Sequence, residues 1–177
     1  TNALTFSNIE NLIGGSNTDN FNLADGLTFS GSIDGQNGVN TLTFAAFTSG
    51  RSVTLTGLGS QTGFDGMEAS LTGGFANIRT LVGGAAADSL TGANLAANWE
   101  IDGSNQYKSG AATLIFSAFE TIGGGSGVDT FDISGPQTHD LLGGDGNDTF
   151  KLNGSASLNG TIDGGAHTLG DALDYSA

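Results

Sequence analysis

Gly124-Gly125-Ser126-Gly127-Val128-Asp129-Thr130-Phe131 and Gly143-Gly144-Asp145-Gly146-Asn147-Asp148-Thr149-Phe150 share one pattern. Each stretch has a glycine pair, three residues, an aspartate, one residue and a phenylalanine. The pattern recurs at residues 14–21 and, with leucine in the last place, at 83–90. Four copies in 177 residues indicate an internal repeat, which is the first feature to look for in a glycine-rich chain.

Related Ile-Asp-Gly turns lie between these copies, at residues 33–35, 101–103 and 162–164. Together the turns recur about every 20 residues, except between 35 and 84, where we expect two longer coils with a loop around 57–74. Short runs rich in β-branched and aromatic residues separate the turns, such as Thr41–Phe44 and Thr113–Phe116. The spacing predicts a single all-β domain over 1–177. Its fold would be a right-handed parallel β-solenoid (a β-helix or β-roll) of about seven to eight coils.

The alternative fold is an antiparallel sandwich with glycine-rich hairpins. We prefer the solenoid because a sandwich does not require a constant register of about 20 residues. In a solenoid, equivalent residues of successive coils stack as ladders. We therefore expect one ladder of Phe21, Leu90, Phe131 and Phe150 and another of Leu12, Leu81, Ile122 and Leu142. The four aspartates of the repeated pattern should share one edge: Asp19, Asp88, Asp129 and Asp148.

Composition excludes several classes of protein. The chain carries 4 Lys and Arg against 18 Asp and Glu, a net charge of −14, which argues against nucleic-acid binding. It has no cysteine, and therefore no disulfide framework or thiolate metal site. No apolar run reaches the roughly 18–20 residues of a membrane span. Hydrophobic residues make up 37% of the chain, which is enough to build a core rather than a disordered linker.

The repeated aspartates suggest a cation site. Ca²⁺ prefers carboxylate and carbonyl oxygens, and stacked turns would bring Asp129 and Asp148 together, with Asp145 and Asn147 nearby. The other interpretation is that each aspartate only caps its own turn. We prefer capping for Asp19 and Asp88, because neither copy keeps the glycine at the fourth place of the pattern.

The stretches at 124–131 and 143–150 resemble the glycine-rich nonapeptides of RTX proteins. That resemblance implies parallel β-rolls stacked on calcium. More loosely, most of the chain resembles the haemagglutinin-like and adhesin-like repeat regions of giant bacterial surface proteins. The turn between the two stretches, residues 134–140, does not match the nonapeptide, so calcium would bind along one side only.

These features favour a structural role: a rigid, acidic, extracellular spacer or fibre segment at a bacterial surface. Residues 172–177 resemble residues 3–8, so we expect neighbouring repeats or subunits to stack end to end. An adhesive module that binds glycan or ice is the alternative. A polysaccharide-degrading enzyme is disfavoured, because Asp129 and Asp132 would point to opposite faces of a strand and no catalytic set emerges. We expect Trp99 and Tyr107 to pack in the core rather than stack on sugars.

Overall fold

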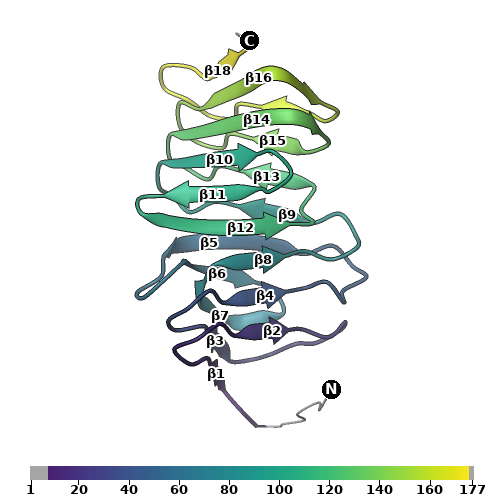
Figure 1. The fold of residues 1–177 in the computed structure, drawn as a ribbon, viewed down its shortest axis with the longest axis vertical. Coiled ribbons are helices and arrows are strands. Elements are labelled where there is room, and N and C mark those ends of the chain that lie inside the picture. The colour runs from purple at the N-terminus through teal and green to yellow at the C-terminus, as the bar shows by residue number, and fades with distance from the viewer. Residues whose placement is uncertain (1–7, 176–177) are drawn as a thin grey trace.

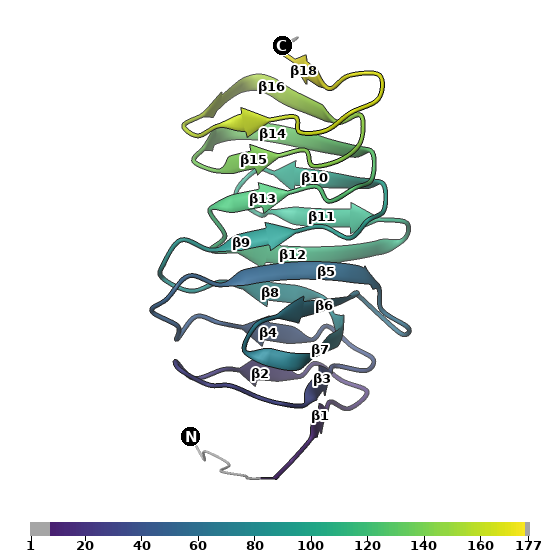
Figure 2. The same ribbon diagram turned by 180° about the vertical axis from the view of Figure 1, so that it is seen from behind.

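The computed structural model describes residues 8–175, and all regular secondary structure in that range is β. Two nine-stranded sheets lie face to face and form a tall stack (Figures 1 and 2). In spatial order the first sheet contains β1 (Asn11–Ile13), β3 (Ser32–Asp34), β7 (Leu71–Ile78), β6 (Phe64–Glu68), β5 (Ser52–Leu58), β9 (Ser89–Thr91), β13 (Thr121–Gly123), β15 (Asp140–Leu142) and β17 (Ile162–Asp163). The second sheet contains β2 (Asn20–Asn22), β4 (Thr41–Thr43), β8 (Thr80–Val82), β12 (Ala112–Ser117), β11 (Gln106–Ser109), β10 (Ala97–Ile101), β14 (Asp129–Gln137), β16 (Thr149–Leu158) and β18 (Ala172–Asp174).

The expectation of a single right-handed parallel β-solenoid is wrong. Both sheets are mixed, neither closes, and the arrangement is sandwich-like. Parallel pairs join many strands, but β5, β6 and β7 pair antiparallel in the first sheet, as do β10, β11 and β12 in the second. We call these two groups the antiparallel triplets. The sandwich alternative, with its glycine-rich hairpins, is closer to the observed fold.

Local chemistry explains the antiparallel triplets. The chain reverses between β5 and β6 at Gly63 and between β11 and β12 at Gly110, with φ of 61° and 58°. Glycine adopts this left-handed region without the steric cost that a Cβ would bring, so it suits tight reversals. Ile101-Asp102-Gly103, which we interpreted as a coil turn, is the reversal between β10 and β11. The even spacing of turns from 84 to 125 therefore does not mark equivalent positions.

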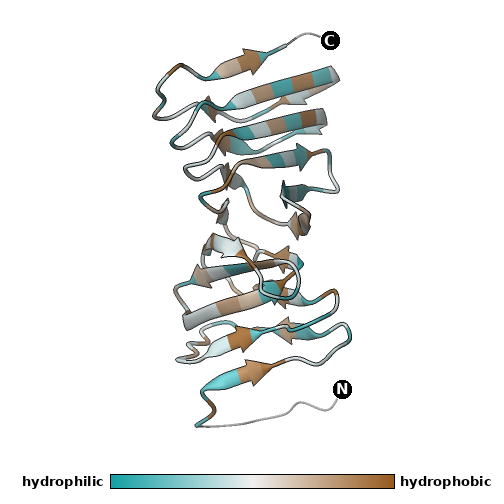
Figure 3. Ribbon diagram, turned by 90° about the vertical axis from the view of Figure 1, so that its left-hand side faces the viewer, coloured by the Kyte–Doolittle hydropathy of each residue, from teal (hydrophilic) through white to brown (hydrophobic). Residues whose placement is uncertain are grey.

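Apolar side chains align as a ladder through the second sheet; those from Leu42 to Phe150 are buried, whereas Leu173 at the outer end is 62% exposed. Strand pairing aligns Phe21, Leu42 and Leu81 at one end and Tyr107, Trp99, Phe131, Phe150 and Leu173 at the other. Trp99 stacks on Phe131 with ring centroids 5.8 Å apart, and Phe131 stacks on Phe150 at 4.7 Å. Trp99 and Tyr107 are fully buried, which supports core packing over an exposed sugar-stacking role. Hydrophobic and hydrophilic residues alternate along these strands (Figure 3).

The two expected ladders exchange members. Leu90 pairs with Val53 and Ile122 in the first sheet, whereas Leu81 belongs to the second. The first-sheet partner of Ile122 on the other side is Leu141, which is buried, and not Leu142, which is 40% exposed. The copy at 83–90 leads from the second sheet to the first, while the other three copies lead from the first to the second.

No helix in residues 8–175 has the length and apolar character that a membrane crossing requires. Residues 3–7, which take part in the expected similarity between the two ends, lie outside the described residues.

Candidate functional site: the aspartate stack

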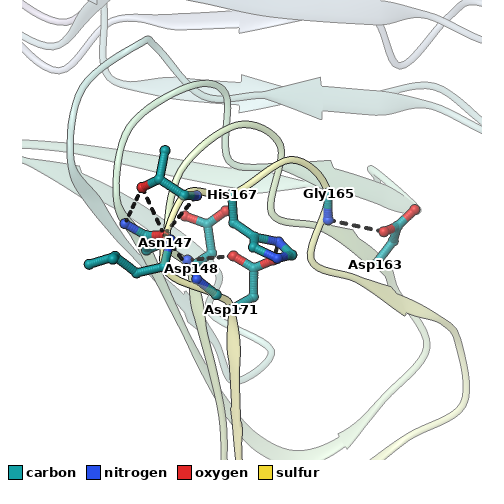
Figure 4. A network of polar contacts seen from close by, with 9 residues as sticks. Asn147, Asp148, Asp163, Gly165, His167 and Asp171 are labelled. Atoms are coloured by element: carbon teal, nitrogen blue, oxygen red, sulfur yellow. Dashed lines mark hydrogen bonds and ion pairs between the residues drawn. The ribbon is translucent and has the colours of Figure 1, made fainter.

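Three aspartates stand one above another where strands of the second sheet begin. Asp129 is the first residue of β14, Asp148 directly precedes β16, and Asp171 directly precedes β18. The N–H of Asp129 donates to Oδ1 of Asp148 at 2.8 Å. The N–H of Asp148 in turn donates to Oδ1 of Asp171 at 2.9 Å (Figure 4). We call these three residues the aspartate stack. The side chains of Asp148 and Asp171 thus each support the backbone of the neighbouring turn.

Three carboxylate oxygens of the aspartate stack remain without a hydrogen-bond partner. They are both oxygens of Asp129 and Oδ2 of Asp148, all inaccessible to solvent. Asp129 is 0% exposed and Asp148 is 1% exposed. An ionised carboxylate in such a place is costly unless it takes up a proton or a cation.

Glycine conformation explains why these oxygens lack partners. In the copies at 14–21 and 83–90, the second glycine of the pair donates its N–H to Oδ2 of the aspartate, as Gly15 does to Asp19 at 2.7 Å. In the other two copies, Gly125 and Gly144 have φ of 106° and 96°. A Cβ on Gly144 would lie 2.1 Å from the carbonyl oxygen of Gly125, so only glycine allows these turns to stack so closely. In this conformation neither glycine donates to its aspartate.

Burial and mutual repulsion change the proton affinity of the stack. Desolvation, followed by the charge of Asp148, raises the pKa of Asp129 to about 7, although the nearby N–H of Ala97 partly offsets the rise. Burial also raises the pKa of Asp148, and the N–H of Asp129 opposes that effect. Both carboxyls therefore bind protons more tightly than exposed aspartates do.

The structure does not gather all four expected calcium ligands. Asp145 is exposed. Oδ1 of Asn147 accepts the backbone N–H groups of Thr168, Leu169 and Gly170, so it holds the neighbouring loop in place. Across residues 8–175, no three His, Asp or Glu side chains form a preassembled metal site. Of the four expected ligands, only Asp129 and Asp148 keep unpartnered carboxylate oxygens, and a hydrogen bond joins these two residues.

Asp171 is the member of the stack that sequence reasoning missed. Its Oδ2 lies 2.9 Å from Nδ1 of His167 (Figure 4). The sequence carries a signal for it: Gly164-Gly165 is followed by five residues instead of three, then by Asp171, Ala172 and Leu173. Allowing a two-residue insertion in the repeated pattern would have identified this copy.

Asp19 and Asp88 act as turn caps, and they do not share an edge. Asp19 and Asp148 directly precede strands of the second sheet, and Asp129 is the first residue of one. Asp88 instead precedes β9 of the first sheet. The N–H of Asp88 donates to Oε2 of Glu120 at 2.8 Å, and Oδ1 of Asp88 accepts the N–H of Arg51. The expectation that all four aspartates lie on one edge is therefore wrong for Asp88.

Comparison with known proteins adds no relative. No protein-family model matches the chain, and no curated protein sequence is significantly similar to it.

Proposed function

We propose that the chain is a structural module, a spacer or fibre segment of an extracellular or cell-surface bacterial protein. The observation that carries this proposal is the unbroken hydrophobic core, to which strands along the whole stack contribute. A continuous core between paired sheets resists bending, and a net charge of −14 favours solubility and discourages lateral association. The resemblance of residues 124–131 and 143–150 to RTX repeats agrees with a surface or secreted location.

We infer that neighbouring repeats or subunits add to the stack through its outer strands. β18 is an edge strand of the second sheet. Leu173 within β18 is 62% exposed, and Tyr175, which follows β18, is 69% exposed. Unpaired strand edges with exposed apolar side chains readily accept another strand.

Solution scattering and sedimentation test the structural proposal. We expect an elongated particle that associates further as concentration rises, and we expect Leu173→Lys to reduce that association. Leu95→Lys is the matched control, because Leu95 is 38% exposed but lies on the turn before β10. A compact or flexible particle would contradict the rigid module, and association unaffected by Leu173→Lys would contradict stacking through β18.

We also propose that Ca²⁺ binds at Asp129 and Asp148 and stabilises the module. Three buried carboxylate oxygens without hydrogen-bond partners supply the hard ligands that Ca²⁺ prefers. Backbone carbonyls and water would have to complete the coordination, since Asn147 is engaged elsewhere. A cation between the two carboxylates would also remove their repulsion.

Thermal unfolding with and without calcium tests this site. After chelator treatment, adding Ca²⁺ at roughly 10⁻⁴–10⁻³ M should raise the melting temperature, as expected for an extracellular module. Asp148→Asn should remove that rise, whereas Asp102→Asn should retain it, because Asp102 is an exposed turn residue at the opposite end of β10 from Ala97, the position paired with Asp129. Equal melting temperatures with chelator and with 10⁻² M calcium, roughly ten times the upper end of that range, would contradict calcium binding.

A further inference from the structure

The two antiparallel triplets build a cleft that the repeat does not explain. The reversal between β5 and β6 comes from the first sheet, and the reversal between β11 and β12 comes from the second. Both contribute to one cleft of about 340 Å³ in the middle of the stack, where Figures 1 and 2 show the triplets. Leu58, Gln61, Thr62, Arg79, Ala112 and Thr113 are among its lining residues. A cleft of this size accommodates a ligand of about one sugar unit.

Arg79 is held firmly at this cleft. It links β7 to β8, so it lies where the chain crosses between sheets. Its N–H donates to the carbonyl oxygen of Asn40 at 3.0 Å, and its own carbonyl oxygen accepts the N–H of Ile115 at 2.9 Å. Its side-chain stem passes Gly63, where an added Cβ would come within 2.8 Å of Cγ. The backbone and the beginning of the side chain are therefore fixed before any ligand arrives.

Arg79 differs in charge pairing from every other lysine and arginine of the chain. Arg51 pairs with Glu68, Lys108 with Glu100, and Lys151 with Asp132 at 4.0 Å. No carboxylate oxygen of the described residues lies within 4.0 Å of the Arg79 guanidinium, although the chain has 18 Asp and Glu. An unpaired guanidinium in a strongly acidic protein is available for an anion from outside.

The remaining groups of the cleft suit a sugar better than a bare ion. The Thr113 hydroxyl makes no hydrogen bond within residues 8–175, so it is available to a ligand. The Thr62 hydroxyl donates to the carbonyl oxygen of Gln36 at 3.1 Å and can still accept a hydrogen bond. Leu58, which is 47% exposed, provides an apolar wall for the face of a ring.

We propose that this cleft binds a carboxylate-bearing sugar unit, such as a uronic acid. Arg79 receives the carboxylate, because a guanidinium fork matches a carboxylate in two parallel hydrogen bonds. Thr62 and Thr113 contact ring hydroxyls, and Leu58 packs against the apolar side of the ring. At physiological ionic strength the screening length is about 8 Å, so distant carboxylates of the protein do not prevent binding. This inference is independent of the structural and calcium proposals.

Calorimetry or NMR titration with sodium glucuronate tests the cleft, with glucose and sodium sulfate as comparison ligands. We expect glucuronate to bind in the roughly millimolar range and glucose to bind at least about tenfold more weakly. Arg79→Gln should weaken glucuronate binding about tenfold or more, and Thr113→Val should weaken it less. Lys151→Gln is the control, since it removes the same charge from a paired site and should leave binding unchanged.

Three results would overturn the proposal. Glucose binding as tightly as glucuronate would exclude a carboxylate site. Sulfate binding as tightly would reduce the cleft to a general anion site. Binding that survives both Arg79→Gln and Thr113→Val would place the ligand elsewhere. Circular dichroism of each variant confirms that the sheets are retained, and Arg79→Lys provides a second variant that keeps the charge but loses the fork.

Discussion

The C-terminal region, residues 121–174, and the middle region, residues 52–117, use similar short strands in different ways. In the C-terminal region each strand pairs in parallel with the next strand of its own sheet, and the aspartate stack follows that order. In the middle region the two antiparallel triplets interrupt the order and create the Arg79 cleft. Parallel pairing of repeated strands thus aligns equivalent residues, such as Asp129 and Asp148. The antiparallel triplets instead bring residues of different kinds together at the Arg79 cleft.

Trp99 joins the two regions, and its loss should have the largest effect. It pairs with Tyr107 inside a triplet and with Phe131 in the C-terminal region, and it is fully buried. Trp99→Ala should lower the free energy of unfolding by about 3–5 kcal/mol, because it leaves a large cavity. Urea unfolding measures the change, and Trp99→Phe should retain much of the stability. If Trp99→Ala costs less than about 1 kcal/mol, the two regions do not share one core.

Leu141 and Leu142 test the register of the C-terminal region. Leu141→Ala should cost about 2–5 kcal/mol, because its side chain is fully buried between Ile122 and Ile162. Leu142→Ala, on the opposite face of the same strand, should cost less than about 1 kcal/mol. Chemical denaturation of both variants is the measurement. The reverse ranking would mean that β15 is shifted by one residue, which exchanges its two faces.

Asp88 and Asp19 occupy the same place in the repeated turn but lie in different surroundings, so their substitutions can be compared. Asp88 is buried and accepts hydrogen bonds from Gly84 and Arg51, while Asp19 is only partly buried and accepts one from Gly15. Asp88→Ala should therefore cost about 1.5–3 kcal/mol and Asp19→Ala about 1 kcal/mol or less. Thermal and urea unfolding give both values. Equal costs would show that burial adds nothing to the cap.

Asp129 should produce the smallest change, and one of opposite sign. Its pKa of about 7 in the folded protein exceeds the usual value near 3.9 of an unfolded chain. The unfolded state therefore loses this proton first, and the wild type loses stability as pH rises from about 4 to about 7. In calcium-free buffer, Asp129→Asn should be more stable than the wild type at pH 8, by on the order of 1 kcal/mol, because the buried amide lacks partners and this offsets part of the gain.

The two proteins should be similar in stability at pH 4, where Asp129 of the wild type is protonated in the folded state and still about half protonated in the unfolded chain. Urea unfolding at pH 4 and pH 8 measures the difference. Asp102→Asn, which changes an exposed turn, should follow the wild type at both pH values. Identical pH dependence of Asp129→Asn and wild type would show that Asp129 finds a partner that offsets its burial.

The sequence was informative wherever local chemistry decides the structure. The alternation in Thr130–Ile133 predicts a strand with Phe131 inside, and the glycine pairs mark the turns that Asp19 and Asp88 cap. Strand direction depends on contacts between distant segments, so spacing alone did not distinguish the reversal at Gly103 from a coil turn. The unsatisfied oxygens of Asp129 depend on the φ of Gly125, which residue identity permits but does not dictate.

Sequence distance between paired positions also differs between the regions, and this bears on the order of folding. Asp129 and Asp148 are 19 residues apart and Asp148 and Asp171 are 23, whereas pairs inside the triplets join Leu58 to Phe64 and Tyr107 to Leu114, which are only 6 and 7 residues apart. Closing a longer loop costs more chain entropy, and its contacts form more slowly. The antiparallel triplets can therefore form first as local hairpins, while the Arg79 cleft, which joins residues 58–63 to residues 111–113, forms later.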